Sequence, residues 1–325
     1  MQDSEKKLYP LHFLPRTGET PWGSVTYTLA DLGYIDPEVA GGWLAGNTFS
    51  ELMETYLERV SGDEAFEAFG TQFPVLVKVL DVRERQPLCL TAGDEVAAQR
   101  YDAFGKTFLW HVLEASEDAE LFIGFNRDMD ASAFYTRCRS GQVEPVLNRL
   151  RPRKGDTFLV RPGTVFAAGA GLKLLEISES SELMFHLHGW GKTEEDDLEE
   201  AFDLIDFRKS EPAPVAETPV DKGGAAFGLA SGEAFTAVRL PLAQPLHISA
   251  QAPGSFAVYH CLQGSAAVRL SERPDAERFP IPSGATLLVP AEVFDFFLVP
   301  EAPGTQVLEI LGGTPVTKDS YLENG

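Results

Sequence analysis

The sequence has 325 residues, 44% of them hydrophobic, which allows one or two globular domains with sizeable cores. Its 49 acidic and 27 basic residues give a net charge of −22, which excludes nucleic acid as the main partner while leaving room for a small anion in a locally positive pocket. The three cysteines are far apart and form no C-x-x-C motif, as is typical of a reducing compartment. The amino terminus carries no apolar signal-peptide core, and no run approaches the ~20 apolar residues that span a bilayer, so we predict a cytoplasmic protein with no membrane partner.

The first clear element is a helix over residues 47–60, "NTFSELMETYLERV", which Thr48 or Ser50 can cap. From Phe73 the pattern changes to "FPVLVKVLDV", a nearly continuous apolar run that predicts a strand buried on both faces. Short strands separated by turn residues follow: "TFLWHVLEA", "AELFIGF", "DTFLVRPG" and "LKLLEISES". Further helices are expected over residues 131–139, 143–150 and, as an acidic amphipathic helix, 192–207.

Residues 209–224, "KSEPAPVAETPVDKGG", are rich in proline and charge and have no apolar period, which predicts a linker. We therefore expect one domain over residues 1–208 and a second over residues 225–325. A weak internal repeat supports this division, because "KGDTFLVRPGTVFAAG" and "SGATLLVPAEVFDFFL" share a glycine, a short apolar strand and a proline. "LKLLEI" and "TQVLEIL" then follow the two copies. The repeat predicts a mainly β fold of two tandem barrels with several added helices.

Few residues suggest chemistry by themselves. His186 and His188 share one face of a strand and can supply two metal ligands, or they are simply polar strand residues, since no third ligand is evident. Lys78 lies within an apolar run, so it must pair with an anion such as Asp81 or face a polar cavity. Lys106, in the turn "FGKTF", lies at a cavity mouth or in solvent.

Taken together, six segments resemble the type I mannose-6-phosphate isomerases, which are double cupins. In chain order they are "TPWGS", "FPVLVKVLDVRERQPL", "GKTFLW", "GDTFLVRPGTVFAAGAG", "LEISESSELMFHLHGWGK" and "DLIDF". The resemblance implies two cupin (jelly-roll) barrels, the first of them catalytic. It also implies interconversion of mannose 6-phosphate and fructose 6-phosphate with a bound metal, usually zinc, held by Q-V-H-P, G-K-T-E and G-T-V-H segments, and a catalytic arginine in a segment like R-L-Y-D-W-G.

The positions that match those ligands carry other residues here. The four metal positions hold Cys89, Thr91, Phe108 and Phe166, and the arginine position holds His186. One sulfur donor does not hold zinc, so the comparison predicts no metal and no cofactor. The second barrel does not replace the site, because its equivalent position is Asp295. Part of the substrate pocket does match, at Lys78, Lys106, Trp110 and Trp22, and these four residues together with His186 are the pocket candidates.

Three hypotheses follow for the function. The first is a degenerate, metal-free isomerase-like protein that retains binding of a sugar or sugar phosphate, as a sensor or accessory subunit. The second is an active mannose-6-phosphate isomerase with a rearranged site, in which Cys89, His186 and either His188 or His111 converge. The third is a non-enzymatic cupin that interacts with other proteins. The sequence leaves open whether the protein is an enzyme, because fold does not fix function.

Overall fold

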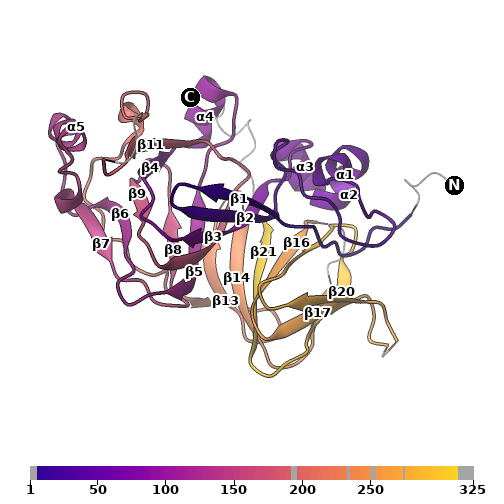
Figure 1. The fold of residues 1–325 in the computed structure, drawn as a ribbon. Coiled ribbons are helices and arrows are strands. Elements are labelled where there is room, and N and C mark those ends of the chain that lie inside the picture. Colours follow the sequence, from indigo (N-terminus) through magenta and orange to yellow (C-terminus); the bar gives the residue numbers. More distant parts are fainter. Residues whose placement is uncertain (1–5, 192–195, 233–234, 250–253, 274, 314–325) are drawn as a thin grey trace. The chain divides into compact units, whose positions relative to one another are not determined.

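The computed structural model describes residues 6–191, 196–232, 235–249, 254–273 and 275–313, and these form a mainly β structure with a few short helices (Figure 1). The predicted fold class, two tandem cupin barrels with added helices, is confirmed by the strands and their order. The chain forms two compact units: one contains the described parts of residues 1–16, 27–76 and 216–325, and the other contains residues 17–26 and the described part of 77–215. The domain limits at 208 and 225 remain a prediction.

The first barrel has two sheets. Six strands form one sheet in the order β1-β2-β3-β10-β5-β8, and five form the other in the order β11-β4-β9-β6-β7. The strands of the first sheet are Arg16–Thr20, Gly23–Leu29, Val75–Val82, Leu172–Glu179, Phe108–Ala115 and Thr157–Val160, in that order. Those of the second sheet are Met184–His188, Leu88–Thr91, Phe166–Ala168, Leu121–Phe125 and Leu147–Leu150.

The second barrel repeats this strand order except for β11. Its sheets are β12-β13-β14-β21-β16-β19 and β15-β20-β17-β18. The first of these consists of Thr218–Pro219, Phe227–Ser231, Phe235–Leu242, Thr305–Gly312, Ala257–Gln263 and Thr286–Val289. The second consists of Leu246–Ser249, Asp295–Pro300, Ser265–Arg269 and Arg278–Pro282. Within the described residues, β11 is the strand of the first barrel that has no counterpart, so the weak sequence repeat corresponds to a nearly complete structural one.

The expected helix over 47–60 forms as two pieces, α1 (Phe49–Tyr56) and α2 (Glu58–Ser61). Thr48 caps α1 as predicted: its hydroxyl accepts a hydrogen bond from the Glu51 backbone N–H, and the Glu51 carboxylate accepts one from the Thr48 N–H. The helix breaks at Leu57, where φ is +48° and the backbone leaves the helical region.

The remaining α-helices are α3 (Asp63–Phe69) and α4 (Asp94–Tyr101), which the sequence did not predict, and α5 (Ala131–Ser140), which it did. No helix of the described chain is long and apolar enough to cross a membrane.

Two predicted helices are wrong. Residues 143–150 form a 3₁₀ turn (Glu144–Val146) and then strand β7, because the Asn148 amide donates to the backbone oxygens of Ile123 and Phe125 on the neighbouring strand. Of the acidic segment 192–207, residues 192–195 lie outside the described part, and the rest contains only a 3₁₀ turn (Phe202–Leu204). The Asp196 carboxylate accepts a hydrogen bond from the Leu198 backbone N–H, a local alternative that competes with helix formation, and the Asp197 carboxylate accepts one from His186 on β11.

Candidate functional site

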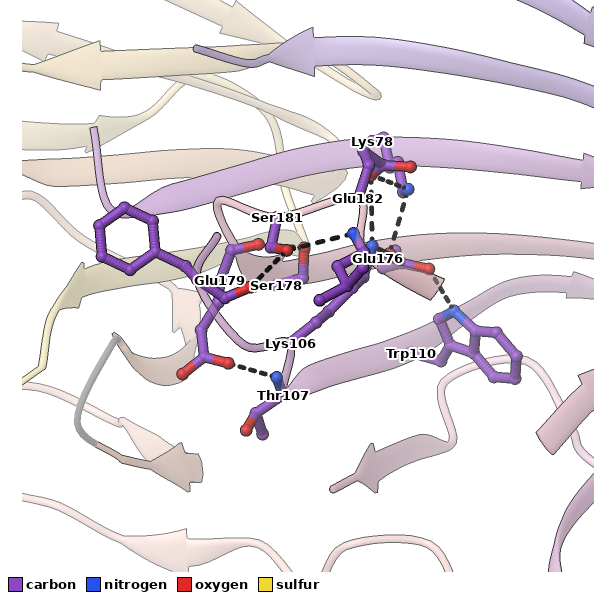
Figure 2. Close-up of polar contacts among 11 residues, drawn as sticks. Lys78, Lys106, Thr107, Trp110, Glu176, Ser178, Glu179, Ser181 and Glu182 are labelled. Atoms are coloured by element: carbon purple, nitrogen blue, oxygen red, sulfur yellow. Dashed lines mark hydrogen bonds and ion pairs between the residues drawn. The ribbon is translucent and has the colours of Figure 1, made fainter. Parts of the chain in front are cut away.

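Three neighbouring strands of the first barrel bring together a lysine, a glutamate and a tryptophan. Lys78 lies on β3, Glu176 on β10 and Trp110 on β5, and Glu176 and Trp110 are directly opposite each other in the antiparallel pair. The Trp110 Nε1–H donates to Glu176 Oε2 over 2.8 Å, while Glu176 Oε1 lies 3.3 Å from Lys78 Nζ (Figure 2). Each oxygen of the buried carboxylate therefore has a different partner.

Lys106 and Glu182 complete this group, which we call the lysine–glutamate cluster (Lys78, Lys106, Glu176 and Glu182). Lys106 Nζ lies 3.1 Å from Glu176 Oε1 and 3.2 Å from Glu182 Oε1, and Lys78 Nζ lies 2.5 Å from Glu182 Oε1. Both lysines are almost fully buried, as is Glu176, whereas 21% of the Glu182 side chain is exposed. Two positive and two negative charges balance within the cluster.

The pKa shifts follow from this pairing. Burial raises the pKa of a carboxyl, but the charges of Lys106 and Lys78 outweigh it and hold the pKa of Glu176 at about 2. The same balance lowers the pKa of Glu182. For Lys78, burial alone would lower the pKa, yet Glu176 and Glu182 together raise it above the ordinary lysine value. All three groups are therefore charged at neutral pH.

This geometry gives both lysines ion-pair partners, and their role toward a ligand stays a prediction. Lys78 is ion-paired with two carboxylates, while Asp81, an odd number of residues away on the same strand, is exposed. Lys106 is buried among the same carboxylates, so it does not lie in solvent. Glu176 and Glu182 were not among the predicted site residues. The sequence did hold a signal for Glu176, since a charge in the apolar strand "LKLLEI" requires a partner just as Lys78 does.

Two aromatic rings occupy the positions where the family resemblance places metal ligands. Phe108 and Phe166 contact each other edge to face with ring centroids 4.8 Å apart. Trp110 packs against both, at 5.0 Å from Phe108 and 5.5 Å from Phe166. All three side chains are buried. They form an aromatic layer, and its Trp110 donates the hydrogen bond to Glu176 of the lysine–glutamate cluster.

Cys89 and Thr91 lie on the same face of strand β4. Their neighbours Leu88 and Leu90 belong to an apolar cluster on the opposite face, with residues of β6, α5 and β11. Cys89 pairs with Phe166 across the sheet, its thiol donates to the Pro87 backbone oxygen over 3.3 Å, and burial raises the pKa of that thiol. The Thr91 hydroxyl is buried and has no hydrogen-bond partner in the described structure.

The other predicted site residues are more dispersed. His186 lies opposite Cys89 on β11, and its backbone N–H donates to Asp197 Oδ2 over 2.8 Å. Trp22 lies in the turn between β1 and β2, where its backbone oxygen accepts from the N–H groups of Arg83 and Glu84. His111 follows Trp110 on β5 and pairs with Thr157. Among the described residues, no group of three or more His, Cys, Asp and Glu side chains is placed to hold a metal ion.

Two tandem barrels with matching strand order define the chain as a double-cupin protein. No protein-family profile matches it. It is 29% identical over 222 residues to mannose-6-phosphate isomerase ManA of Bacillus subtilis, covering 61% of this chain and 68% of the relative. It is also 24% identical over 265 residues to the putative isomerase YvyI of the same organism, covering 79% and 80%.

Solved structures agree on the fold. The mannose 6-phosphate isomerase from Bacillus subtilis superposes with a TM-score of 0.80 at 21% identity, covering 93% of this chain and 99% of that one. A putative mannosephosphate isomerase from Archaeoglobus fulgidus gives a TM-score of 0.74 at 19% identity, covering 94% and 99%. In sequence and fold, the chain is therefore similar to the mannose-6-phosphate isomerases.

Proposed function

We propose that this chain is a mannose-6-phosphate isomerase-like protein that has lost metal-assisted isomerisation and retains binding of a sugar phosphate. The observation that carries the proposal is the contact between Phe108 and Phe166, whose rings meet where the family resemblance places two metal ligands. Apolar rings in van der Waals contact leave neither donor atoms nor room for an ion and its water at those positions.

The residues at the four positions do not fit zinc. A zinc site needs three or four nitrogen, oxygen or sulfur donors, and these positions supply one thiol, one hydroxyl and two hydrocarbon rings. The thiol of Cys89 is poorly suited as well, because zinc binds the thiolate and burial raises the pKa of this group. We therefore derive no catalytic step through a metal.

The part that remains suited to a ligand is the pair of lysines. Lys78 and Lys106 direct two ammonium groups at one point, where the carboxylate of Glu182 now lies, and lysine binds phosphate as a compact positive charge. The curated relatives are named for mannose 6-phosphate, which makes a sugar phosphate the first ligand to test. A cytoplasmic location, where sugar phosphates occur, is part of the same proposal.

The loss of catalysis is tested by metal analysis of the purified protein together with an isomerase assay in both directions. Protein incubated with zinc and desalted is expected to hold far less than one zinc per chain and to show no turnover of mannose 6-phosphate above a buffer control. Stoichiometric zinc with sustained turnover would instead support the active isomerase with a rearranged site. Cys89→Ser, Thr91→Ala and His186→Ala variants would then identify the ligands.

Retained binding is tested by thermal denaturation with mannose 6-phosphate and fructose 6-phosphate. A ligand at ~100 times its dissociation constant adds about 2.7 kcal/mol of stability, which is visible as a shift in Tm. We expect this shift for the wild-type chain and its loss in Lys106→Met. No shift with either compound would favour the third hypothesis, a cupin that acts through protein contacts.

A further inference from the structure

The two carboxylates of the lysine–glutamate cluster are held very differently. Glu176 lies in the middle of β10, and its second oxygen, Oε2, accepts the hydrogen bond from Trp110. Glu182 lies in the segment between β10 and β11, and it meets both lysines through the single oxygen Oε1 (Figure 2). One carboxylate is part of the sheet, whereas the other is a partly exposed side chain on a connecting segment.

The charge balance shows what the position of Glu182 requires. Without its carboxylate, two buried ammonium groups would face the single negative charge of Glu176. An uncompensated charge in the barrel interior is costly, so an anion must occupy this position in every stable state of the site. Either Glu182 supplies that anion or a ligand does.

We propose that Glu182 is an exchangeable counter-ion, whose carboxylate gives way to the phosphate group of a bound sugar phosphate at Lys78 and Lys106. The exchange rests on the proposed function, because it assumes that this cluster is where the ligand binds. A phosphate dianion carries more charge and more acceptor oxygens than one carboxylate and can bond both ammonium groups at once. Glu182 thereby sets the affinity of the site, because each binding event must first displace it.

Hydrogen bonds link the segment of Glu182 to the segment of Lys106. The Ser181 hydroxyl donates to the Phe104 backbone oxygen over 2.8 Å and accepts from the Leu183 N–H. The Thr107 N–H donates to the Glu179 carboxylate. These bonds hold the arrangement in which Glu182 faces the lysines, so a variant that weakens them, such as Ser181→Ala, is expected to favour exchange.

Calorimetric titration of the full chain with mannose 6-phosphate, mannose and inorganic phosphate tests the exchange. Glu182→Gln keeps the size of the side chain and removes its charge, and it should bind mannose 6-phosphate at least about tenfold more tightly than wild type, about 1.4 kcal/mol. Glu117→Gln, the same change at an exposed residue of the same barrel, should bind like wild type. Mannose, which carries no phosphate group, should bind wild type and both variants with the same affinity. Inorganic phosphate should bind Glu182→Gln if the site recognises the phosphate group itself.

The outcomes separate the two proposals. Equal affinity of wild type and Glu182→Gln, with binding lost in Lys106→Met, would overturn the exchange and leave sugar-phosphate binding intact. Weaker binding by Glu182→Gln would also overturn it, since Glu182 would then contact the ligand directly. An absence of binding in every variant would overturn both. If Glu182→Gln fails to fold, Ser181→Ala gives the same test with the charge retained: tighter binding supports the exchange, and unchanged binding contradicts it.

Discussion

Each of the two barrels has a buried glutamate, and the two glutamates lie at equivalent positions of equivalent sheets. Glu176 on β10 lies opposite Trp110 on β5, and Glu309 on β21 lies opposite Tyr259 on β16. In each barrel the aromatic side chain donates to the carboxylate, through Nε1–H over 2.8 Å in the first and through the hydroxyl over 3.0 Å in the second. The aromatic–glutamate pair is therefore a repeated part of the framework.

A histidine–threonine pair is repeated in the same way. His111 Nδ1 and Thr157 Oγ1 are 2.9 Å apart, and so are His260 Nδ1 and Thr286 Oγ1. Each histidine directly follows the aromatic residue of its barrel, and each threonine begins the neighbouring strand, opposite that histidine. Because strand neighbours face opposite sides, the two repeated pairs tie the sheet together on both of its faces.

The barrels differ in the cations around the glutamate. Glu309 meets Lys222, whose side chain is 31% exposed and comes from the predicted linker. Glu176 meets two buried lysines and shares them with Glu182, in the segment that leads to β11, the strand without a counterpart in the described second barrel. The aromatic–glutamate and histidine–threonine pairs are common to both barrels, whereas the two buried lysines around the glutamate belong to the first.

The largest predicted contrast concerns Phe166 and Asp295, which occupy equivalent strand positions opposite Cys89 and Ser249. Phe166→Ala should lower the free energy of unfolding by about 3–5 kcal/mol, because it leaves a cavity in the aromatic layer. Asp295→Ala should cost less than about 1 kcal/mol, since it removes an exposed pair with His247. Urea denaturation of each variant measures both values. Similar losses of stability in the two variants would contradict the assignment of Phe166 to the core and Asp295 to the surface.

The next contrast compares the two buried glutamates. Glu176→Gln should destabilise the protein by about 3 kcal/mol or more, because Lys78 and Lys106 are then left with too little negative charge in a buried site. Glu309→Gln should cost about 1–2 kcal/mol, since Lys222 can turn to solvent and the amide still accepts from Tyr259. The same denaturation experiment applies, and a larger loss for Glu309→Gln would contradict the comparison.

Lowering the pH should reduce the contribution of Glu176 to the free energy of unfolding. Its pKa is about 2 in the folded chain against 4.5 ordinarily, so its stabilisation is complete above about pH 4.5 and is lost as the pH falls through 2. Between pH 6 and pH 3, the stability difference between wild type and Glu176→Gln should shrink by about 2 kcal/mol. If the free energies of unfolding of the two proteins change in parallel with pH over this range, the pKa of Glu176 is not lower in the folded chain than in the unfolded chain.

The sequence predicted those features whose causes are local. The capped start of α1 depends on Thr48 and Glu51, and strand β3 on an unbroken apolar run, so both could be read from a few adjacent letters. The repeat "GDTFLV" and "GATLLV" already held the two threonines of the histidine–threonine pairs. The two barrels and the aromatic positions of the first followed from the repeat and the family resemblance.

The parts that could not be predicted depend on residues far apart in the chain. Residues 147–150 form a strand because Asn148 bonds to β6, a contact that no helical period reveals. Glu182 looks like an ordinary loop residue until the fold brings Lys78 and Lys106 to it. The sequence indicates that Lys78 needs a partner, but the one candidate that proximity in the sequence offers is Asp81.

The smallest predicted effect tests whether the histidine–threonine pairs are equivalent. Thr157→Val and Thr286→Val each remove one hydroxyl at nearly constant volume and leave a buried histidine nitrogen without that partner, which should cost about 1–2 kcal/mol. Thr286→Val should lie at the upper end, because the Thr286 hydroxyl also donates to Thr28 over 2.9 Å. Losses within this range for both variants, measured by urea denaturation, would establish the pairs as common framework. A loss of sugar-phosphate binding in Thr157→Val alone would instead assign the first pair to the site, since Trp110, which precedes His111, belongs to both the aromatic layer and the hydrogen bond to Glu176.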